Sequence, residues 1–138
     1  MDATIAGRPR ALTPAPLLRF ALRLDAAASG VLALLMLLGA PLLADPLGLP
    51  EGLLRGAGLV CLPYAAVLAW MTGRPSLPAW AVWSVIGLNA VWTADSLLLL
   101  ASGWVAPTAL GTAFVLAQAA AVGGFALLQW RGLARSRA

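Results

Sequence analysis

Residues 31–38 read Val-Leu-Ala-Leu-Leu-Met-Leu-Leu and lie within a stretch, residues 25–43, in which Asp25 is the only charged residue. An α-helix rises about 1.5 Å per residue, so roughly 20 apolar residues cross the hydrocarbon core of a bilayer. Chains of soluble domains do not sustain apolar runs of this length. The stretch therefore predicts a first transmembrane helix.

Three further apolar stretches follow at residues 52–71, 78–101 and 107–130, separated by short segments rich in proline and glycine. Pro63 lies inside the second stretch and removes one helical hydrogen bond, a defect that membrane helices tolerate. The chain is 62% hydrophobic and only 10% charged, far from the composition of soluble domains. We predict an all-α membrane protein with four transmembrane helices in an up-down antiparallel bundle.

The flanking segments are short, which leaves a single transmembrane domain at residues 17–131. Residues 1–16 contain several prolines and lack apolar periodicity, which predicts a flexible N-terminal arm. Residues 132–138 form a basic tail. A cleaved signal peptide is the alternative for the first apolar stretch, but the long arm and the three later spans favour a retained helix.

The arginines predict the orientation in the membrane. Eight of the nine basic residues precede the first span, join the second to the third, or follow the fourth, and only Arg55 falls on the other side. Positively charged loops stay in the cytoplasm, so both termini are expected there. A bias toward alanine, arginine and leucine indicates a GC-rich bacterial genome. We therefore expect a multi-pass protein of the bacterial cytoplasmic (inner) membrane.

The residue types that are missing exclude several classes of chemistry. Histidine is absent, which excludes a His-ligated haem, a His-based zinc site and a histidine general base. Cys61 is the only cysteine, so no intramolecular disulfide is expected. Because no phosphate loop, metal-ligand cluster or activated nucleophile is evident either, we predict a protein that is not an enzyme and has no cofactor or metal. The net charge of +4 resides in arginines at the ends and loops, which does not predict nucleic-acid binding.

Ionisable residues at membrane depth are costly and are candidates for a functional site. Asp95 and Arg55 are placed in the outer third of adjacent antiparallel helices, where we predict an ion pair that locks the two helices together. Asp95 as a proton or cation site, with Arg55 tuning its charge, is the alternative. Asp45 and Glu51 compete as partners of Arg55.

Asp25 is the third ionisable candidate. It follows Arg19 and Arg23 at the predicted inner end of the first helix. Pairing with these arginines or with Arg74 would neutralise it. We therefore interpret Asp25 as an anchor at the membrane interface.

The third stretch carries a polar face. Asn89, Thr93 and Ser96 are spaced by four and three residues, so they share one side of a helix next to Trp92. Such groups seek partners on neighbouring helices, and the fourth helix offers Gln118 and Thr112. The alternative is a wet cavity lined by Asn89, Thr93, Gln118 and Trp92.

Small residues spaced by four predict close helix packing at Gly52 and Gly56 on the second helix and at Ala119 and Gly123 on the fourth. Together with the short loops, these faces favour a non-catalytic oligomer or an accessory subunit that packs against partner helices. The expected partners are the lipid bilayer and either a homo-oligomer or a larger membrane complex. A small transporter or channel at Asp95 is the second hypothesis.

The third hypothesis is that an apolar ligand such as a quinone or lipid binds between the helices, near the tryptophans and Pro63. What occupies the space between the helices distinguishes the three hypotheses. A filled, dry bundle favours the accessory subunit, a hydrated path beside Asp95 favours the transporter, and an elongated apolar cleft favours ligand binding.

Overall fold

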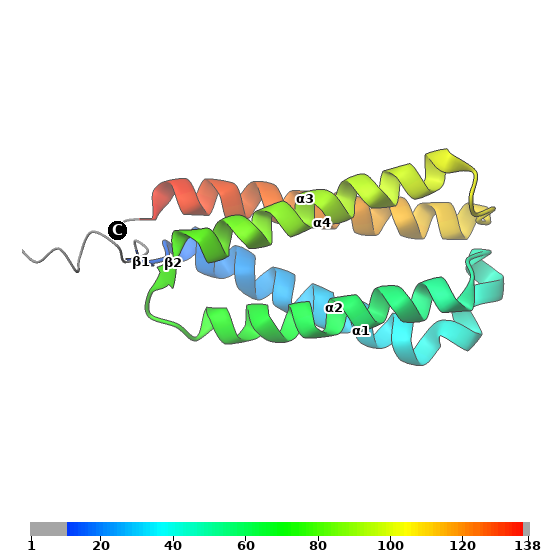
Figure 1. The fold of residues 1–138 in the computed structure, drawn as a ribbon, viewed down its shortest axis with the longest axis horizontal. Coiled ribbons are helices and arrows are strands. Elements are labelled where there is room, and N and C mark those ends of the chain that lie inside the picture. Colours follow the sequence, from blue (N-terminus) through cyan, green and yellow to red (C-terminus); the bar gives the residue numbers. More distant parts are fainter. Residues whose placement is uncertain (1–10, 137–138) are drawn as a thin grey trace, which may run out of the picture.

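The computed structural model describes residues 11–136 as a bundle of long helices (Figure 1). Its four helices are α1 (Pro16–Leu47), α2 (Glu51–Thr72), α3 (Ala79–Ser102) and α4 (Ala109–Arg135). Consecutive helices run in opposite directions, and each is long and apolar enough to cross a bilayer. The predicted architecture of four antiparallel helices is confirmed, and the chain is a multi-pass membrane protein.

Helix α1 is longer than the span predicted at residues 25–43. It begins at Pro16, where the missing N–H of proline is harmless in the first turn, and it continues through Pro41 and Pro46 to Leu47. It stops at Gly48, whose left-handed backbone (φ 66°) suits glycine. Asp25 is therefore inside a helix and not at its start.

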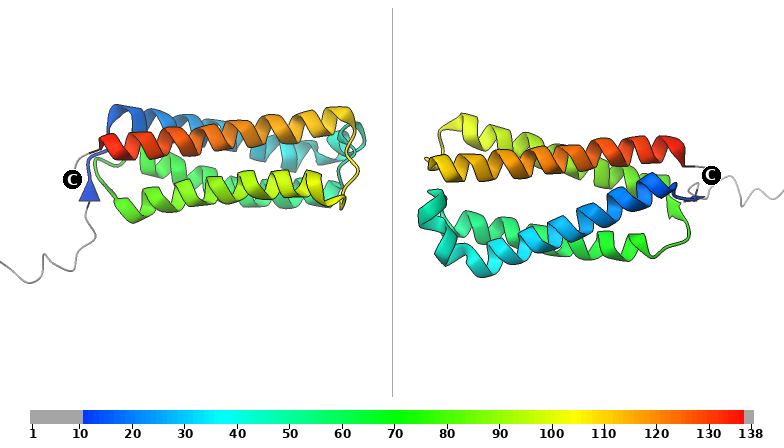
Figure 2. Two further views of the ribbon diagram at one scale, coloured as in Figure 1. Left: turned by 90° about the horizontal axis from the view of Figure 1, so that it is seen from above. Right: turned by 180° about the vertical axis from the view of Figure 1, so that it is seen from behind.

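One end of the bundle is closed by a small antiparallel ladder in which β1 (Ala11–Leu12) pairs with β2 (Leu77–Pro78) (Figures 1 and 2). The last part of the predicted flexible arm is thus held in place. Residues 1–10 of that arm and 137–138 of the predicted tail lie outside the described residues. We name this end the arginine end, because it carries Arg19, Arg23, Arg74, Arg131 and Arg135. The opposite end is the Gly48 end.

The helices form two hairpins that meet along one seam only. Helix α1 packs against α2 and α4, and α3 packs against α4, whereas α2 and α3 barely approach each other. Figure 1 shows that α1 crosses the bundle obliquely from the end of α4 toward α2, so it contacts both helices. The bundle is closed between α1 and α4 and open between α2 and α3.

Glycines allow the close approaches. A Cβ atom added at Gly132 would lie 2.6 Å from the Cα of Leu18, so α4 touches the backbone of α1 there. The predicted close-packing face at Gly52 and Gly56 meets no other helix of the described chain, because nothing lies within 4 Å of a Cβ added at either residue. These two glycines face the open side of the bundle. On α4, a Cβ atom added at Gly123 would lie 3.5 Å from Thr93 Cγ2 of α3, which is ordinary van der Waals contact.

Candidate functional site

A buried carboxylate lies at the centre of a polar cluster to which all four helices contribute. Asp25 is completely buried, and its Oδ1 accepts a hydrogen bond from Ser29 Oγ at 2.9 Å. Its Oδ2 accepts from Tyr64 Oη at 2.8 Å, Asn89 Nδ2 at 2.8 Å and Gln129 Nε2 at 2.7 Å. We name these five residues the Asp25 network.

The members of the network also bond to one another. Asn89 Nδ2 donates to Gln129 Oε1 at 2.9 Å, and Tyr64 Oη lies 2.8 Å from both Asp25 Oδ2 and Asn89 Oδ1. A hydroxyl has one proton, so Tyr64 donates to only one of these two acceptors at a time. No buried side-chain nitrogen or oxygen in the described part of the chain lacks a partner. Each buried polar atom of the network therefore has at least one partner within the chain.

Local sequence explains how the network assembles. Ser29 follows Asp25 by one helical turn, so both side chains lie on the same face of α1. On α4, Gln129 precedes Gly132 by three residues and shares its face, and Gly132 contacts Leu18 of α1 closely. The glycine brings α4 near enough for the completely buried Gln129 amide to reach Asp25.

The interpretation of Asp25 as an interfacial anchor paired with arginine is wrong. The first helix starts before Arg19, which places Asp25 in the interior, where donors from four helices replace the arginines. Arg19 instead donates to the backbone carbonyls of Arg74 at 3.0 Å and Pro75 at 3.3 Å. Arg23 is exposed, and the Arg74 guanidinium stacks over the Trp70 ring at 4.6 Å from its centroid.

The predicted Asp95–Arg55 ion pair is also wrong. Arg55 Nη2 lies 2.7 Å from Glu51 Oε1, and this is the only ion pair within residues 11–136. Glu51 is one helical turn away on the same helix, so the arginine reaches it without crossing the open side of the bundle. Asp95 is exposed on α3 and makes no side-chain hydrogen bond within the described chain.

A second polar group joins α3 to α4, as predicted for the face of Asn89, Thr93 and Ser96. Trp92 Nε1 donates to Gln118 Oε1, and Gln118 Nε2 donates to Ser96 Oγ at 2.9 Å. Thr93 Oγ1 donates to the backbone carbonyl of Asn89 at 2.9 Å. The predicted contribution of Thr112 is not seen, because its side chain makes no hydrogen bond among the described residues. The amide of Asn89 belongs to the Asp25 network instead.

The open side of the bundle is a cleft between α2 and α3. Its part near the arginine end, which we name the Tyr64 cavity, measures about 600 Å³. Its part near the Gly48 end, the Asp95 cavity, measures about 620 Å³. Both are lined by Leu32, Val60 and Trp92, so they adjoin as one elongated α2/α3 cleft.

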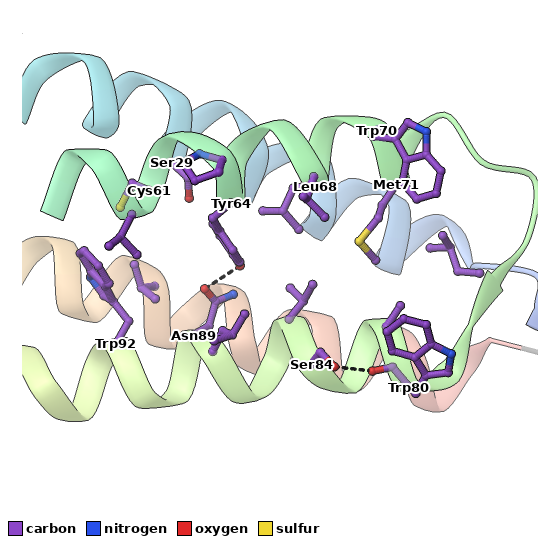
Figure 3. Close-up of a pocket in the computed structure, with 18 of the residues that line it drawn as sticks. Ser29, Cys61, Tyr64, Leu68, Trp70, Met71, Trp80, Ser84, Asn89 and Trp92 are labelled. Atoms are coloured by element: carbon purple, nitrogen blue, oxygen red, sulfur yellow. Dashed lines mark hydrogen bonds between the residues drawn. The ribbon is translucent and has the colours of Figure 1, made fainter. Parts of the chain in front are cut away.

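Figure 3 shows how the Tyr64 cavity is built. Trp70 and Trp80 lie at one end, Cys61 and Trp92 lie at the other, and Tyr64 and Asn89 point toward each other in between. Most of the remaining wall is aliphatic. The Asp25 network therefore contributes Ser29, Tyr64 and Asn89 to the wall of a mainly apolar cavity.

The arrangement suits binding. Ligand sites in proteins are concave and mostly apolar, with a few placed polar groups that orient the ligand. Among residues 11–136, no group of three or more cysteine, aspartate or glutamate side chains is arranged to hold a metal ion. The cleft offers a mainly apolar wall, the hydroxyl of Tyr64 and the amide of Asn89, and the charges of Arg74 in the Tyr64 cavity and Asp95 in the Asp95 cavity.

Sequence reasoning identified Asn89, Trp92 and Gln118 but missed Ser29, Tyr64 and Gln129. The sequence does indicate Ser29 and Gln129, because they are polar residues within apolar stretches, where unpaired amides and hydroxyls are costly. Comparisons of the chain with protein-family models, with curated proteins and with solved structures found no match.

Proposed function

We propose that the protein binds an amphiphilic, largely apolar ligand, a lipid or a quinone, in the α2/α3 cleft. The observation that carries the proposal is the Tyr64 cavity. Its volume of about 600 Å³ lies within the range of roughly 300–1,000 Å³ typical of small-molecule sites. A filled bundle would have favoured a purely structural role, and an elongated apolar cleft favours ligand binding.

The polar groups of the cavity support an amphiphile over a plain hydrocarbon. Arg74 lies at one end of the cavity, where it can meet a polar head group, whereas the donors of Tyr64 and Asn89 are engaged within the Asp25 network. The network holds the hydroxyl and the amide in place before any ligand arrives, which reduces the entropic cost of binding. The proposed role is binding without catalysis.

A substitution that fills the cavity tests this proposal. Val67 is 54% exposed and lines the Tyr64 cavity, whereas Val31 is 68% exposed and lines neither cavity. We expect Val67→Phe to lose most of the lipid or quinone that co-purifies with the protein, and Val31→Phe to retain it, as measured by mass spectrometry of the intact protein. Equal ligand content in the two variants would contradict the proposal.

A partner helix is the second candidate occupant, as expected for an accessory subunit or a homo-oligomer. Gly52 and Gly56 line the Asp95 cavity, are spaced by four, and leave open space where a Cβ atom would lie. Such a face admits the backbone of another transmembrane helix. Gly56→Leu would then change the oligomeric state in mild detergent, as measured by light scattering. An unchanged mass would leave ligand binding as the use of the cleft.

We further propose that the protein lies in a bacterial cytoplasmic membrane with the arginine end in the cytoplasm. Five arginines gather at that end within residues 11–136, against Arg55 near the other end, and basic residues favour the cytoplasmic side. A reporter fused after Ala138 should behave as cytoplasmic, and one inserted at Gly48 should behave as periplasmic. A periplasmic signal from the fusion at Ala138 would reverse the orientation.

A further inference from the structure

We propose that the ligand of the Tyr64 cavity is an anionic phospholipid whose head group sits beside Arg74 and one of whose acyl chains runs toward Trp92. This inference rests on the proposed function and adds to it the charge of the ligand and its direction in the cleft. It follows from the charges at the two ends of the cleft, the donors at its mouth, and the apolar wall between them.

Among residues 11–136, Arg74 is the only charged residue that lines the Tyr64 cavity. Its guanidinium lies over the Trp70 ring, 4.6 Å from the centroid, which holds the charge at the mouth of the cavity. No carboxylate in residues 11–136 pairs with it. A phosphate placed there would meet a guanidinium that has no competing anion among these residues, and guanidinium groups match phosphate geometry well.

The surroundings of Arg74 add to the positive charge. Arg19 donates to the carbonyls of Arg74 and Pro75, so a second guanidinium fixes the turn that carries Arg74. The nearest acidic group on the described chain at this end of the cleft is Asp25, which is completely buried and engaged by four donors. The mouth of the Tyr64 cavity is therefore positive.

The other end of the cleft has the opposite character. Asp95 is the only charged residue of the described chain that lines the Asp95 cavity, and it is exposed. A negatively charged head group is repelled from that end and attracted to Arg74, so the two ends together fix the direction of an anionic amphiphile.

The mouth also offers neutral donors. Trp70 and Trp80 are 61% and 62% exposed and lie at the same end of the cavity (Figure 3). Neither indole N–H bonds to another described residue, and tryptophan at the membrane interface commonly contacts the head-group region. These N–H groups are available to phosphate or ester oxygens of a lipid held at Arg74.

Between the mouth and Trp92, the wall consists mainly of aliphatic side chains such as Val67, Leu68 and Leu88. Ser84 lies in this part of the wall, but its hydroxyl donates to the carbonyl of Trp80 on the preceding turn. The path therefore suits an acyl chain, and Tyr64 and Asn89 lie beyond the head group, along the chain.

The test uses the full chain in nanodiscs that contain equal amounts of phosphatidylglycerol and phosphatidylcholine, followed by mass spectrometry of retained lipids. Arg74→Gln should lower the preference for phosphatidylglycerol by about fivefold, the attraction expected of one basic side chain near an anionic lipid surface. Arg23→Gln is the matched control, because Arg23 is exposed at the same end and does not line the cavity. Arg74→Lys keeps the charge and should keep most of the preference.

The outcomes separate this inference from the proposed function. If Val67→Phe expels retained lipid but Arg74→Gln leaves the preference unchanged, the cleft binds a ligand with a neutral head group and the inference is overturned. An equal fall in Arg74→Gln and Arg23→Gln would show only general attraction to the surface, which also overturns it. If Val67→Phe retains as much lipid as Val31→Phe, the proposed function itself fails. Thermal melting of each variant verifies that it is folded.

Discussion

The seam between α1 and α4 and the seam between α2 and α3 are built from similarly apolar helices, yet only the first is closed. At the closed seam, Gly132 admits the backbone of Leu18, and Gln129 donates to the buried Asp25. At the open seam, the contact between Tyr64 and Asn89 is the only side-chain hydrogen bond between the two helices in residues 11–136.

The difference shows what decides packing in a bilayer. Lipid tails are as apolar as leucine, so hydrophobic side chains gain little by leaving lipid for another helix. Close packing needs small residues that admit a neighbouring backbone, and polar groups that find partners only across the seam. The seam of α1 and α4 has both, whereas bulky side chains such as Trp70, Trp80 and Trp92 line the seam of α2 and α3.

The largest expected effect comes from removing the acceptor at the centre of the closed seam. Asp25→Leu leaves buried N–H groups of Asn89 and Gln129 without their carboxylate. Each unsatisfied buried group costs about 1–3 kcal/mol, so the free energy of unfolding should fall by roughly 3 kcal/mol or more. Thermal or denaturant unfolding in micelles measures the loss.

Two companion variants sharpen this result. Asp25→Asn keeps the shape and one acceptor oxygen, so it should lose less stability than Asp25→Leu. Asp95→Asn alters an exposed residue without a side-chain hydrogen bond in the described chain, so its unfolding should match the parent. Equal losses in Asp25→Leu and Asp95→Asn would mean that the network does not hold the closed seam together.

The second prediction tests the backbone contact at the same seam. In Gly132→Ala, the new Cβ atom would lie 2.6 Å from the Cα and N atoms of Leu18, and neither helix can move aside without disturbing Gln129. Overpacking of this kind costs about 1–3 kcal/mol. Unfolding measured under the same conditions should show a loss within that range.

Gly124→Ala is the matched control on the same helix. Nothing lies within 4 Å of a Cβ atom added there. Alanine favours a helix over glycine by about 1 kcal/mol in water, so this variant should be unchanged or slightly more stable. A destabilised Gly124→Ala together with an unaffected Gly132→Ala would reverse our assignment of the closed and open faces.

Much of the architecture could be predicted because it depends on local properties. Apolar stretches long enough to cross a bilayer mark the helices, and turns rich in glycine and proline separate them. The start of α1 was the exception. Arg19 and Arg23 indicated a membrane boundary just before Asp25, whereas the helix begins at Pro16 and carries both arginines within it.

The site was less predictable because it depends on neighbours that are distant in sequence. Gly56 and Gly132 are the same residue type, but one faces open space and the other faces the backbone of Leu18. Arg55 pairs with Glu51, one turn away on the same helix, and not with Asp95 on another helix as predicted. The cleft cannot be predicted from the sequence, because the same apolar residue types face lipid and line a cleft.

The smallest expected effect concerns the open seam, where Tyr64→Phe removes the single hydroxyl that links α2 to α3. The ring remains, so packing is preserved and only the bonds to Asp25 and Asn89 are lost. A side-chain hydrogen bond between membrane helices contributes about 0.6 kcal/mol on average and rarely more than about 1.7 kcal/mol. Global unfolding should therefore change little.

Opening of the cleft should change measurably, and Cys61 reports on it. It is the only cysteine of the chain, is 7% exposed, and lines the Tyr64 cavity. A loss of about 0.6 kcal/mol at the open seam raises the population of open states about threefold, so a maleimide should label Cys61 of Tyr64→Phe about threefold faster in ligand-free micelles. Ser84→Ala is the control, because the Ser84 hydroxyl bonds only to the carbonyl of Trp80 within its own helix. If Tyr64→Phe and Ser84→Ala are labelled at the same rate, the width of the cleft is set by the side chains that line it, and the bond between Tyr64 and Asn89 contributes nothing to keeping α2 near α3.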